Sequence, residues 1–149
     1  MKRAALWLIL LVAFCGIANS SYIARSEATG TPLICNITGL SGCNIVAQSP
    51  YSHLFGISLA EYGIAYFGLL FILAAAELVA ANRPLRRLIQ ALGVLGLVAS
   101  IVFEAIQFFL IGALCVYCAA SAVLALLAFV FACFIEPVRR SYSPPPTAA

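Results

Sequence analysis

The chain has 149 residues, of which 64% are hydrophobic and 9% are charged. Soluble domains carry roughly 25% charged residues, and a small domain leaves too much of its surface in water to hide this apolar excess. A formal net charge of +3 is also too small for a phosphate-binding face, so no nucleic-acid partner is expected. The composition excludes an ordinary soluble enzyme and predicts a one-domain integral membrane protein surrounded by lipid.

Four apolar stretches are long enough to cross a bilayer, because a spanning helix needs about 20 residues. The predicted helices cover about residues 4–22, 57–81, 88–111 and 113–135, with a tight Gly-centred turn at Ile111-Gly112. The sequence therefore predicts an all-α bundle of four transmembrane helices within one domain, residues 1–137. The remaining residues, 138–149, contain three consecutive prolines, and we expect a disordered cytoplasmic tail there.

Basic residues set the expected orientation, because short cytoplasmic loops are rich in Lys and Arg. Four spans place seven of the eight basic residues on one side: Lys2, Arg3, Arg83, Arg86, Arg87, Arg139 and Arg140. This predicts an N-in/C-in protein of the inner (cytoplasmic) membrane, with residues 23–56 as a long external, periplasmic loop. An alternative treats residues 1–20 as a cleaved signal peptide, which would leave the orientation of the later helices unchanged.

This topology gathers four of the six cysteines on the external side. Cys35 and Cys43 lie in the loop, and Cys115 and Cys118 form a Cys-Val-Tyr-Cys motif in the first turn of the last predicted helix. Cysteines at i and i+3 share a helix face, and the partial positive charge of a helix N-terminus lowers a thiol pKa. The pattern suggests a relay between an outer sulfur that meets protein thiols and an inner sulfur that meets a molecule dissolved in the membrane.

Other readings of the cysteines remain open. The Cys115/Cys118 pair can be a static disulfide, and the Cys35/Cys43 pair a structural staple. All four can form a zinc site, although an oxidising compartment opposes stable thiolates, and we expect no metal. Cys15 and Cys133 lie inside apolar stretches and are expected to be buried core thiols.

The chain resembles the vitamin K epoxide reductase (VKOR) family, specifically its small bacterial members. The residues that carry the resemblance are Cys35 and Cys43, the run Asn44-Ile-Val-Ala-Gln-Ser49-Pro50, Phe55-Gly56, and the run Gln107-Phe-Phe-Leu-Ile-Gly-Ala-Leu-Cys115-Val-Tyr-Cys118. The resemblance covers about residues 5–135. The loop pair precedes a Cys-x-x-Cys at the last helix, whereas the Dsb-type quinone reductases carry theirs in the first external loop.

The resemblance implies a thiol–disulfide oxidoreductase that supports disulfide bond formation. Electrons would pass from a separate thioredoxin-fold (DsbA-like) protein to Cys35/Cys43, and a transient Cys43–Cys115 disulfide would release Cys118 to reduce a membrane quinone (menaquinone or ubiquinone). Many bacterial members carry a fused thioredoxin-like domain that is not seen after the last helix here. Ala122 stands where the vertebrate enzymes have a tyrosine near the quinone.

Several polar residues invite further roles. The resemblance suggests Ser49 as a hydrogen-bonding group near the quinone. Glu104 and Gln107 lie on one face of the third helix; an ionisable group at such depth is costly, and quinone reduction needs two protons, which Glu104 can relay. Glu61 and His53 lie at the external interface and in the loop, where solvated roles are expected.

Two other functions compete with the thiol oxidase. One is a vitamin K quinone or epoxide reductase, which shares the electron path but differs in acceptor and partner. The other is a small four-helix transporter, with Glu104 as coupling carboxylate and structural disulfides. A transporter does not explain a Cys-x-x-Cys at a helix start on the same side as a second cysteine pair.

Overall fold

A computed structural model of the protein describes residues 2–35 and 42–135; the expected tail at 138–149 lies outside the described residues. The described elements are, in chain order, α1 (Lys2–Thr29), α2 (Cys43–Ala47), the short 3-10 helix η1 (Pro50–Ser52), β1 (His53–Leu54), β2 (Ile57–Ser58), α3 (Leu59–Val79), α4 (Arg83–Ile106), the π-helical turn η2 (Gln107–Ile111) and α5 (Val116–Ile135).

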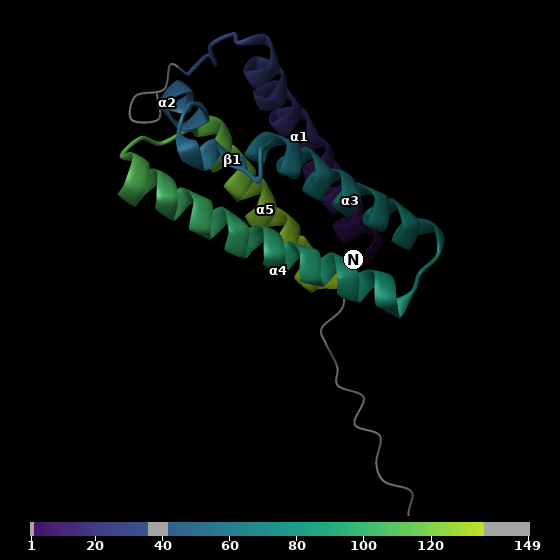
Figure 1. Ribbon diagram of the computed structural model, residues 1–149. Coiled ribbons are helices and arrows are strands. Elements are labelled where there is room, and N and C mark those ends of the chain that lie inside the picture. The colour runs from purple at the N-terminus through teal and green to yellow at the C-terminus, as the bar shows by residue number, and fades with distance from the viewer. Residues whose placement is uncertain (1, 36–41, 136–149) are drawn as a thin grey trace, which may run out of the picture.

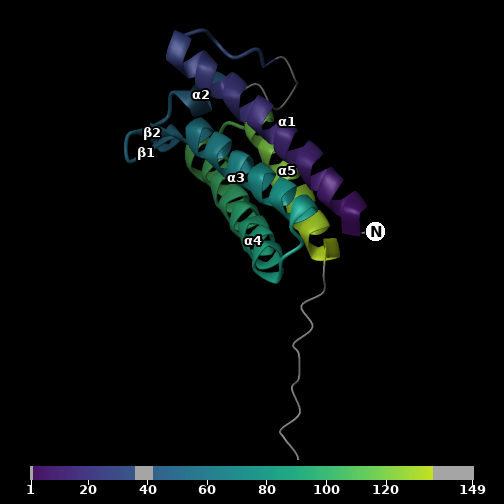
Figure 2. The same ribbon diagram turned by 90° about the vertical axis from the view of Figure 1, so that its right-hand side faces the viewer.

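The four long helices form a bundle in which α1 packs against α3 and α5, and α4 packs against α5 and, less extensively, against α3 (Figure 1). In the described part of the chain all four are long and apolar enough to span a membrane, as the sequence predicts. The centre of the bundle is filled by apolar side chains, among them the fully buried Ile9, Leu70, Ile89 and Ile135. The element α2 and the β1–β2 hairpin gather at the end opposite the α3–α4 connection (Figure 2).

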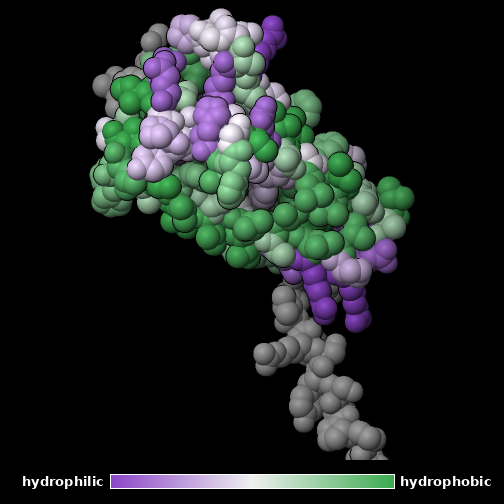
Figure 3. Space-filling model, viewed as in Figure 1, coloured by the Kyte–Doolittle hydropathy of each residue, from purple (hydrophilic) through white to green (hydrophobic). Residues whose placement is uncertain are grey.

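The outer surface of the bundle is apolar, and a band of hydrophobic residues covers the face drawn in Figure 3. Large apolar side chains point outward from every long helix, including Trp7, Ile72, Ile101 and Phe134. Such a surface is expected to face lipid. Cys15 and Cys133 belong to this outer surface, since both are exposed. The prediction that they are core thiols is therefore wrong, because a small apolar side chain is as compatible with lipid as with the protein interior.

The first helix extends seven residues beyond its predicted end. Its last residue is Thr29, and the next residue is Gly30, whose φ of +66° is the left-handed conformation that favours glycine. The N–H of Gly30 donates to Glu27 O, and the N–H of Thr31 donates to Ser26 O. This hydrogen-bond pair is a Schellman motif. The prediction followed only the apolar run and therefore placed the end of the helix near Tyr22. The helix continues with more polar residues beyond the stretch that the prediction assigned to the membrane span.

The predicted third and fourth transmembrane helices, which are α4 and α5, also begin at residues other than the predicted ones. α4 starts at Arg83 rather than near residue 88, and Pro84 lies in its first turn, where proline fits because that N–H has no helical acceptor. The expected turn at Gly112 is confirmed, with a φ of +69°. α5 begins at Val116 rather than residue 113, because residues 113–115 lie outside the helix and Leu114 O instead accepts a hydrogen bond from Gly42 N. α3, in contrast, lies within two residues of its predicted range at both ends.

A buried ion pair fixes the α3–α4 connection. Glu77 is 3% exposed; its carboxylate accepts a hydrogen bond from Arg86 Nε at 2.5 Å and another from the backbone N–H of Asn82 at 2.9 Å. At the other end of α3, the hydroxyl of Ser58 accepts a hydrogen bond from Ala60 N at 3.2 Å and caps the helix. The hairpin before it pairs His53 with Ser58 and Leu54 with Ile57.

Candidate active site

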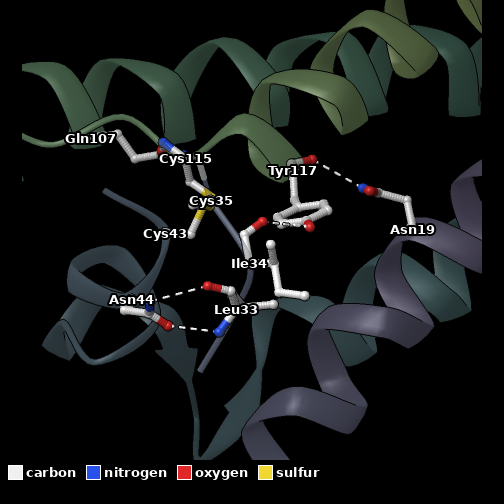
Figure 4. The surroundings of a disulfide bond; sticks show 9 residues. All are labelled: Asn19, Leu33, Ile34, Cys35, Cys43, Asn44, Gln107, Cys115 and Tyr117. Atoms are coloured by element: carbon white, nitrogen blue, oxygen red, sulfur yellow. Dashed lines mark hydrogen bonds between the residues drawn. A yellow bond between two sulfur atoms is a disulfide. The ribbon is translucent and has the colours of Figure 1, made fainter. Parts of the chain in front are cut away.

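Four cysteines meet at one end of the bundle. Cys43 and Cys115 are buried with Leu33 in one apolar cluster, and Cys35 and Cys118 pack against that cluster. Cys35 and Cys43 form a disulfide with a Cα–Cα distance of 6.3 Å, while Cys115 and Cys118 are free thiols. Figure 4 shows the disulfide next to Cys115. The structure therefore brings together the two cysteine pairs that lie far apart in the sequence.

Gly42 attaches the cysteine loop to the α4–α5 connection. Its backbone N–H donates to Leu114 O at 3.0 Å. A Cβ atom on Gly42 would lie 2.7 Å from Ala113 Cβ and 3.0 Å from Leu114 O, which is closer than real Cβ contacts allow. Only glycine permits this approach, and the approach places Cys43 next to Cys115.

Asn44 fixes the other side of the loop. Its Oδ1 accepts a hydrogen bond from Leu33 N at 2.9 Å, and its Nδ2 donates to Leu33 O at 3.2 Å (Figure 4). One side-chain amide thus satisfies both backbone polar groups of Leu33, in the segment that leads to Cys35. The sequence analysis quoted Asn44 only as part of a motif and did not predict this role.

The N-terminus of α5 is organised around Cys115. The sequence predicts Cys115 in the first turn of the helix, but the structure places it just before α5, as the capping residue. Its carbonyl oxygen accepts the first helical hydrogen bond, from Ala119 N at 3.0 Å. A hydrogen bond from the Cys118 thiol, together with backbone N–H groups of Cys118 and Tyr117, lowers the pKa of Cys115 to about 7, although burial opposes this shift. The Cys115 sulfur therefore accepts hydrogen bonds from the N-terminal turn of α5, as a capping side chain does. The sequence predicts a thiol with a lowered pKa at this helix end, and that thiol belongs to the residue just before the helix.

Gln107 accepts the hydrogen bonds that fix the connection from α4 to Cys115. Its side chain is 4% exposed, and its Oε1 accepts a hydrogen bond from Cys115 N at 3.0 Å. Its backbone carbonyl accepts hydrogen bonds from Gly112 N at 2.9 Å and Ala113 N at 3.3 Å. The predicted quinone contact is therefore, first of all, a group that closes the turn from α4 to Cys115.

A second set of hydrogen bonds joins α1 to the same region. Asn19 Nδ2 donates to Tyr117 O at 2.9 Å and to Ser121 Oγ at 2.8 Å. The hydroxyl of Tyr117 donates to Ile34 O at 2.9 Å, next to Cys35. Figure 4 shows these contacts, which run from α1 to the segment that leads to the disulfide. The sequence analysis quoted Tyr117 only as part of the Cys-Val-Tyr-Cys motif and did not predict this role.

A cavity of about 430 Å³ opens beside the cysteines. Its wall is mostly apolar and comes from α1, α3, α4, α5 and the loop, with Tyr66, Phe103 and Ala122 among the lining residues. Cys43, Cys115 and Cys118 all line it, so each cysteine pair contributes to the wall of the same space. The dimensions and the apolar wall suit one flat, hydrophobic ring.

The other predicted polar residues divide into two groups. Ser49, Glu104 and Gln107 line the cavity; the Ser49 hydroxyl donates to Val46 O at 2.7 Å, and Glu104 is half-buried. His53 and Glu61 are exposed and are not part of the lining. Sequence reasoning missed Glu27, which lines the cavity and accepts a hydrogen bond from the Ser58 hydroxyl, because residue 27 was expected in a loop rather than a helix.

The zinc reading finds no counterpart in the described residues, among which no group of three or more His, Cys, Asp or Glu side chains is arranged to hold a metal ion. With Cys35 and Cys43 joined to each other, the chemistry available at this site is that of thiols and disulfides next to an apolar cavity. Cys43 and Cys115, which share one buried cluster, bring the two cysteine pairs together.

Comparison with known proteins agrees with this chemistry. A search of curated proteins found no match. A comparison with known families matches residues 7–133 to the family described as "Vitamin K epoxide reductase family". The match takes in most of α1 and α5, all of α3 and α4, and all four clustered cysteines. Members of this family are oxidoreductases, and the chain belongs to the vitamin K epoxide reductase family.

Proposed function

We propose that the protein is a membrane thiol oxidase that takes electrons from a reduced thioredoxin-fold protein and transfers them to a membrane quinone. The observation that carries the proposal is the packing of Cys43 against Cys115 in one buried cluster, beside an apolar cavity that Cys118 also lines. Family membership favours an oxidoreductase over the alternative of a transporter.

The first step is reduction of the loop disulfide by the partner. Cys35 is half-buried, whereas Cys43 is 0% exposed, so a partner thiolate attacks Cys35 and Cys43 leaves as a thiolate. The second thiol of the partner then resolves the mixed disulfide. The partner is oxidised to a disulfide, and Cys35 and Cys43 receive its two electrons.

The second step moves these electrons to the Cys-x-x-Cys pair. The Cys43 thiolate attacks Cys115 of a Cys115–Cys118 disulfide, which forms a Cys43–Cys115 bond and releases Cys118. Cys35 then attacks Cys43, and Cys115 leaves. A thiol with low pKa is a good leaving group, which is the property that the capping position gives Cys115. The products are a Cys35–Cys43 disulfide and two free thiols, the pairing present in the structure.

The third step passes the electrons out of the protein. A bound quinone would supply an acceptor for two electrons and two protons, and the Cys115–Cys118 disulfide re-forms. The fit rests on the apolar cavity, where Tyr66, Phe103 and Ala122 would contact the ring and Ser49 would provide a hydroxyl. Glu104, in the last turn of α4, lines the same cavity, and it would deliver protons to this space.

The acceptor is proposed to be an ordinary respiratory quinone, ubiquinone or menaquinone, rather than vitamin K epoxide. Ala122 lines the cavity at the position where the vertebrate members have a tyrosine, so that contact is missing from this chain. The positive-inside rule supports placing the cysteines on the external side of the inner membrane. The N-terminal end of α1 and the α3–α4 connection lie at the end of the bundle opposite to α2 (Figure 1).

The proposal is tested with purified full-length protein in lipid nanodiscs, a reduced thioredoxin-fold protein and ubiquinone or menaquinone. Quinone absorbance is expected to fall as the partner is oxidised, in a one-to-one ratio. Cys118→Ala should abolish quinone reduction, and Cys133→Ala, at an exposed lipid-facing cysteine, should not. Quinone reduction that continues without Cys118, or none in the unaltered protein, would contradict the proposal.

A further inference from the structure

Ser52 and His53 lie between the cavity and the surface of the protein. Ser52 lines the cavity and is 6% exposed. The next residue, His53, begins β1 and is exposed. The hairpin that contains His53 lies at the same end of the bundle as α2 (Figure 2). Two consecutive residues thus connect the apolar cavity with the surface at this end of the molecule.

A hydrogen bond joins the two side chains, with 2.8 Å between Ser52 Oγ and His53 Nδ1. Its direction follows from a second contact, because the Ser52 hydroxyl also donates to the carbonyl oxygen of Ser49 at 2.8 Å. A carbonyl oxygen can only accept, so the single hydroxyl hydrogen is used in that bond. His53 must therefore donate its Nδ1–H to Ser52 Oγ, and in the neutral side chain Nε2 is the acceptor.

Backbone contacts hold both residues in this arrangement. Ser49 O also accepts a hydrogen bond from Ser52 N at 3.1 Å, and His53 pairs with Ser58 in the hairpin. An imidazole can gain a proton on one ring nitrogen while it loses one from the other. A histidine held in this way can pass a proton from water at Nε2 to the hydroxyl at Nδ1.

We propose that Ser52 and His53 form a proton relay that carries protons from the external medium into the cavity during quinone reduction. This inference rests on the proposed function. In each passage Ser52 gives its hydroxyl proton to a quinone oxygen, and His53 gives its Nδ1 proton to Ser52 Oγ. Water supplies a proton to His53 Nε2, and the exposed side chain returns to its Nδ1–H form by exchange with water.

The proposed electron path creates the need for this relay. The partner releases two protons outside the membrane when its two thiols become a disulfide, whereas reduction of a quinone to a quinol takes up two electrons and two protons inside the cavity. Glu104 lines the cavity, but one carboxyl group carries one proton. The wall is mostly apolar, so a second proton has to be brought in by another polar group.

Ser52 differs from other polar side chains of the wall because a proton donor lies behind it. The Tyr66 hydroxyl donates to a backbone carbonyl oxygen at 3.2 Å, and Glu27 accepts a hydrogen bond from the Ser58 hydroxyl. Neither contact replaces a proton that the side chain gives away. The His53 imidazole replaces the proton that Ser52 loses, and its own proton comes from water.

The alternative is that the two side chains only stabilise the turn before the hairpin. His53→Asn separates the two roles, because an amide keeps an N–H donor for Ser52 Oγ but cannot gain and lose protons. His53→Ala and Ser52→Ala remove the two members of the relay. Ser21→Ala is the matched control, since Ser21 is an exposed serine of α1 that is not part of the cavity lining.

The first readout is the tautomer of His53, which needs no quinone. The chain has one histidine, so an isotope label on histidine nitrogen reports on His53 alone in protein without a histidine tag. Solid-state NMR in lipid bilayers, at an alkaline pH where imidazole is neutral, distinguishes the two tautomers. The Nδ1–H form should predominate in the unaltered protein and in Ser21→Ala. In Ser52→Ala the Nε2–H form, which a free histidine side chain prefers, should predominate.

The second readout is single-turnover kinetics of full-length protein in lipid nanodiscs, with ubiquinone or menaquinone. Quinone reduction should be roughly a hundredfold slower in Ser52→Ala, His53→Ala and His53→Asn, and unchanged in Ser21→Ala. Exchange between the two cysteine pairs, followed by quenched alkylation, should be the same in all of them. Free imidazole should restore part of the rate to His53→Ala, where the missing ring leaves space, and none to Ser52→Ala.

Four results would overturn the relay while the thiol oxidase stands: a predominant Nε2–H form in the unaltered protein, full quinone reduction in His53→Asn, no recovery of His53→Ala with imidazole, or cysteine exchange that slows together with quinone reduction. The last two would show a structural role. If the unaltered protein does not reduce quinone at all, the proposed function fails, and the relay fails with it. The two failures are therefore distinguishable.

Discussion

Gly42 donates its backbone N–H to the carbonyl oxygen of Leu114 across 3.0 Å. This contact joins a loop that follows the first helix to a connection that precedes the last one. It places the buried Cys43 against Cys115, although 72 residues separate them in the numbering. The relay that we propose depends on this one close approach of two backbone segments.

Replacing Gly42 by alanine is therefore expected to impair the protein. The added methyl group would collide with Ala113 and with the Leu114 carbonyl, and overpacking of this kind costs about 1–3 kcal/mol. We expect a lower midpoint of thermal unfolding and slower exchange between the two cysteine pairs, measured by quenched alkylation. Gly68→Ala is the control, because a Cβ at Gly68 meets nothing within 4 Å. Equal effects of both substitutions would contradict the steric argument.

Asn44→Ala is expected to loosen the loop disulfide. The substitution removes two hydrogen bonds to the backbone of Leu33, each worth about 0.5–1.5 kcal/mol. Dithiothreitol should then reduce the Cys35–Cys43 bond several times faster than in the unaltered protein. Gln48→Ala, which alters an exposed neighbour, should leave the reduction rate unchanged. An unchanged reduction rate in Asn44→Ala would show that Asn44 does not fix the segment around Leu33 that leads to Cys35.

The pKa of Cys115 gives a prediction about pH. The first cause of its lowering to about 7 is the hydrogen bond from Cys118. Cys118→Ala should therefore raise the pKa of Cys115 towards its ordinary value, and Cys118→Ser, which keeps a donor, should raise it less. The thiolate absorbance in the ultraviolet measures this, in protein that also lacks Cys15 and Cys133 and keeps its loop disulfide. Identical titrations of all three proteins would refute the assignment.

The same shift predicts how stability changes with pH. Because the pKa of Cys115 is lower in the folded protein than in the unfolded chain, the folded state binds fewer protons between the two values. The stabilisation is complete above the unfolded pKa and is lost as the pH falls through about 7. With Cys118→Ala this part of the pH dependence should shrink.

Glu104→Gln tests proton delivery. Glu104 lines the same cavity as Cys118, and loss of a proton donor typically lowers a rate by roughly a hundredfold. In single-turnover experiments, exchange between the cysteine pairs should be unaffected while quinone reduction slows. Glu61→Gln, at an exposed residue of the first turn of α3, should affect neither step. If Glu104→Gln slows exchange and quinone reduction alike, Glu104 has a structural role instead.

The sequence predicted the four helices well because their apolar runs are long and interrupted by charges. It predicted their ends less well. The first helix continues to Thr29 because Gly30 supplies the signal that stops it, and this signal is a local hydrogen-bond motif rather than a change in hydropathy. The start of the third predicted helix was placed near residue 88, after the basic residues that interrupt the apolar run, whereas the helix begins at Arg83 with Pro84 in its first turn.

The four cysteines of the site could be predicted from their spacing and from the resemblance to a family. Their supports could not. Asn44 and Asn19 act across 11 and 98 residues of sequence, and nothing in their local patterns indicates which backbone group they bind. Cys115 was expected inside the helix, because the apolar pattern does not reveal that residues 113–115 lie outside the helix and that Leu114 O binds Gly42 N.

The central claim is that Cys43 and Cys115 exchange a disulfide directly. The most direct measurement is disulfide mapping by mass spectrometry in protein that carries both Cys35→Ala and Cys118→Ala, oxidised by diamide in lipid nanodiscs. Our account predicts a nearly complete Cys43–Cys115 bond, with Cys15 and Cys133 left free. Free Cys43 and Cys115 after complete oxidant treatment, or a bond from either of them to another cysteine, would contradict it.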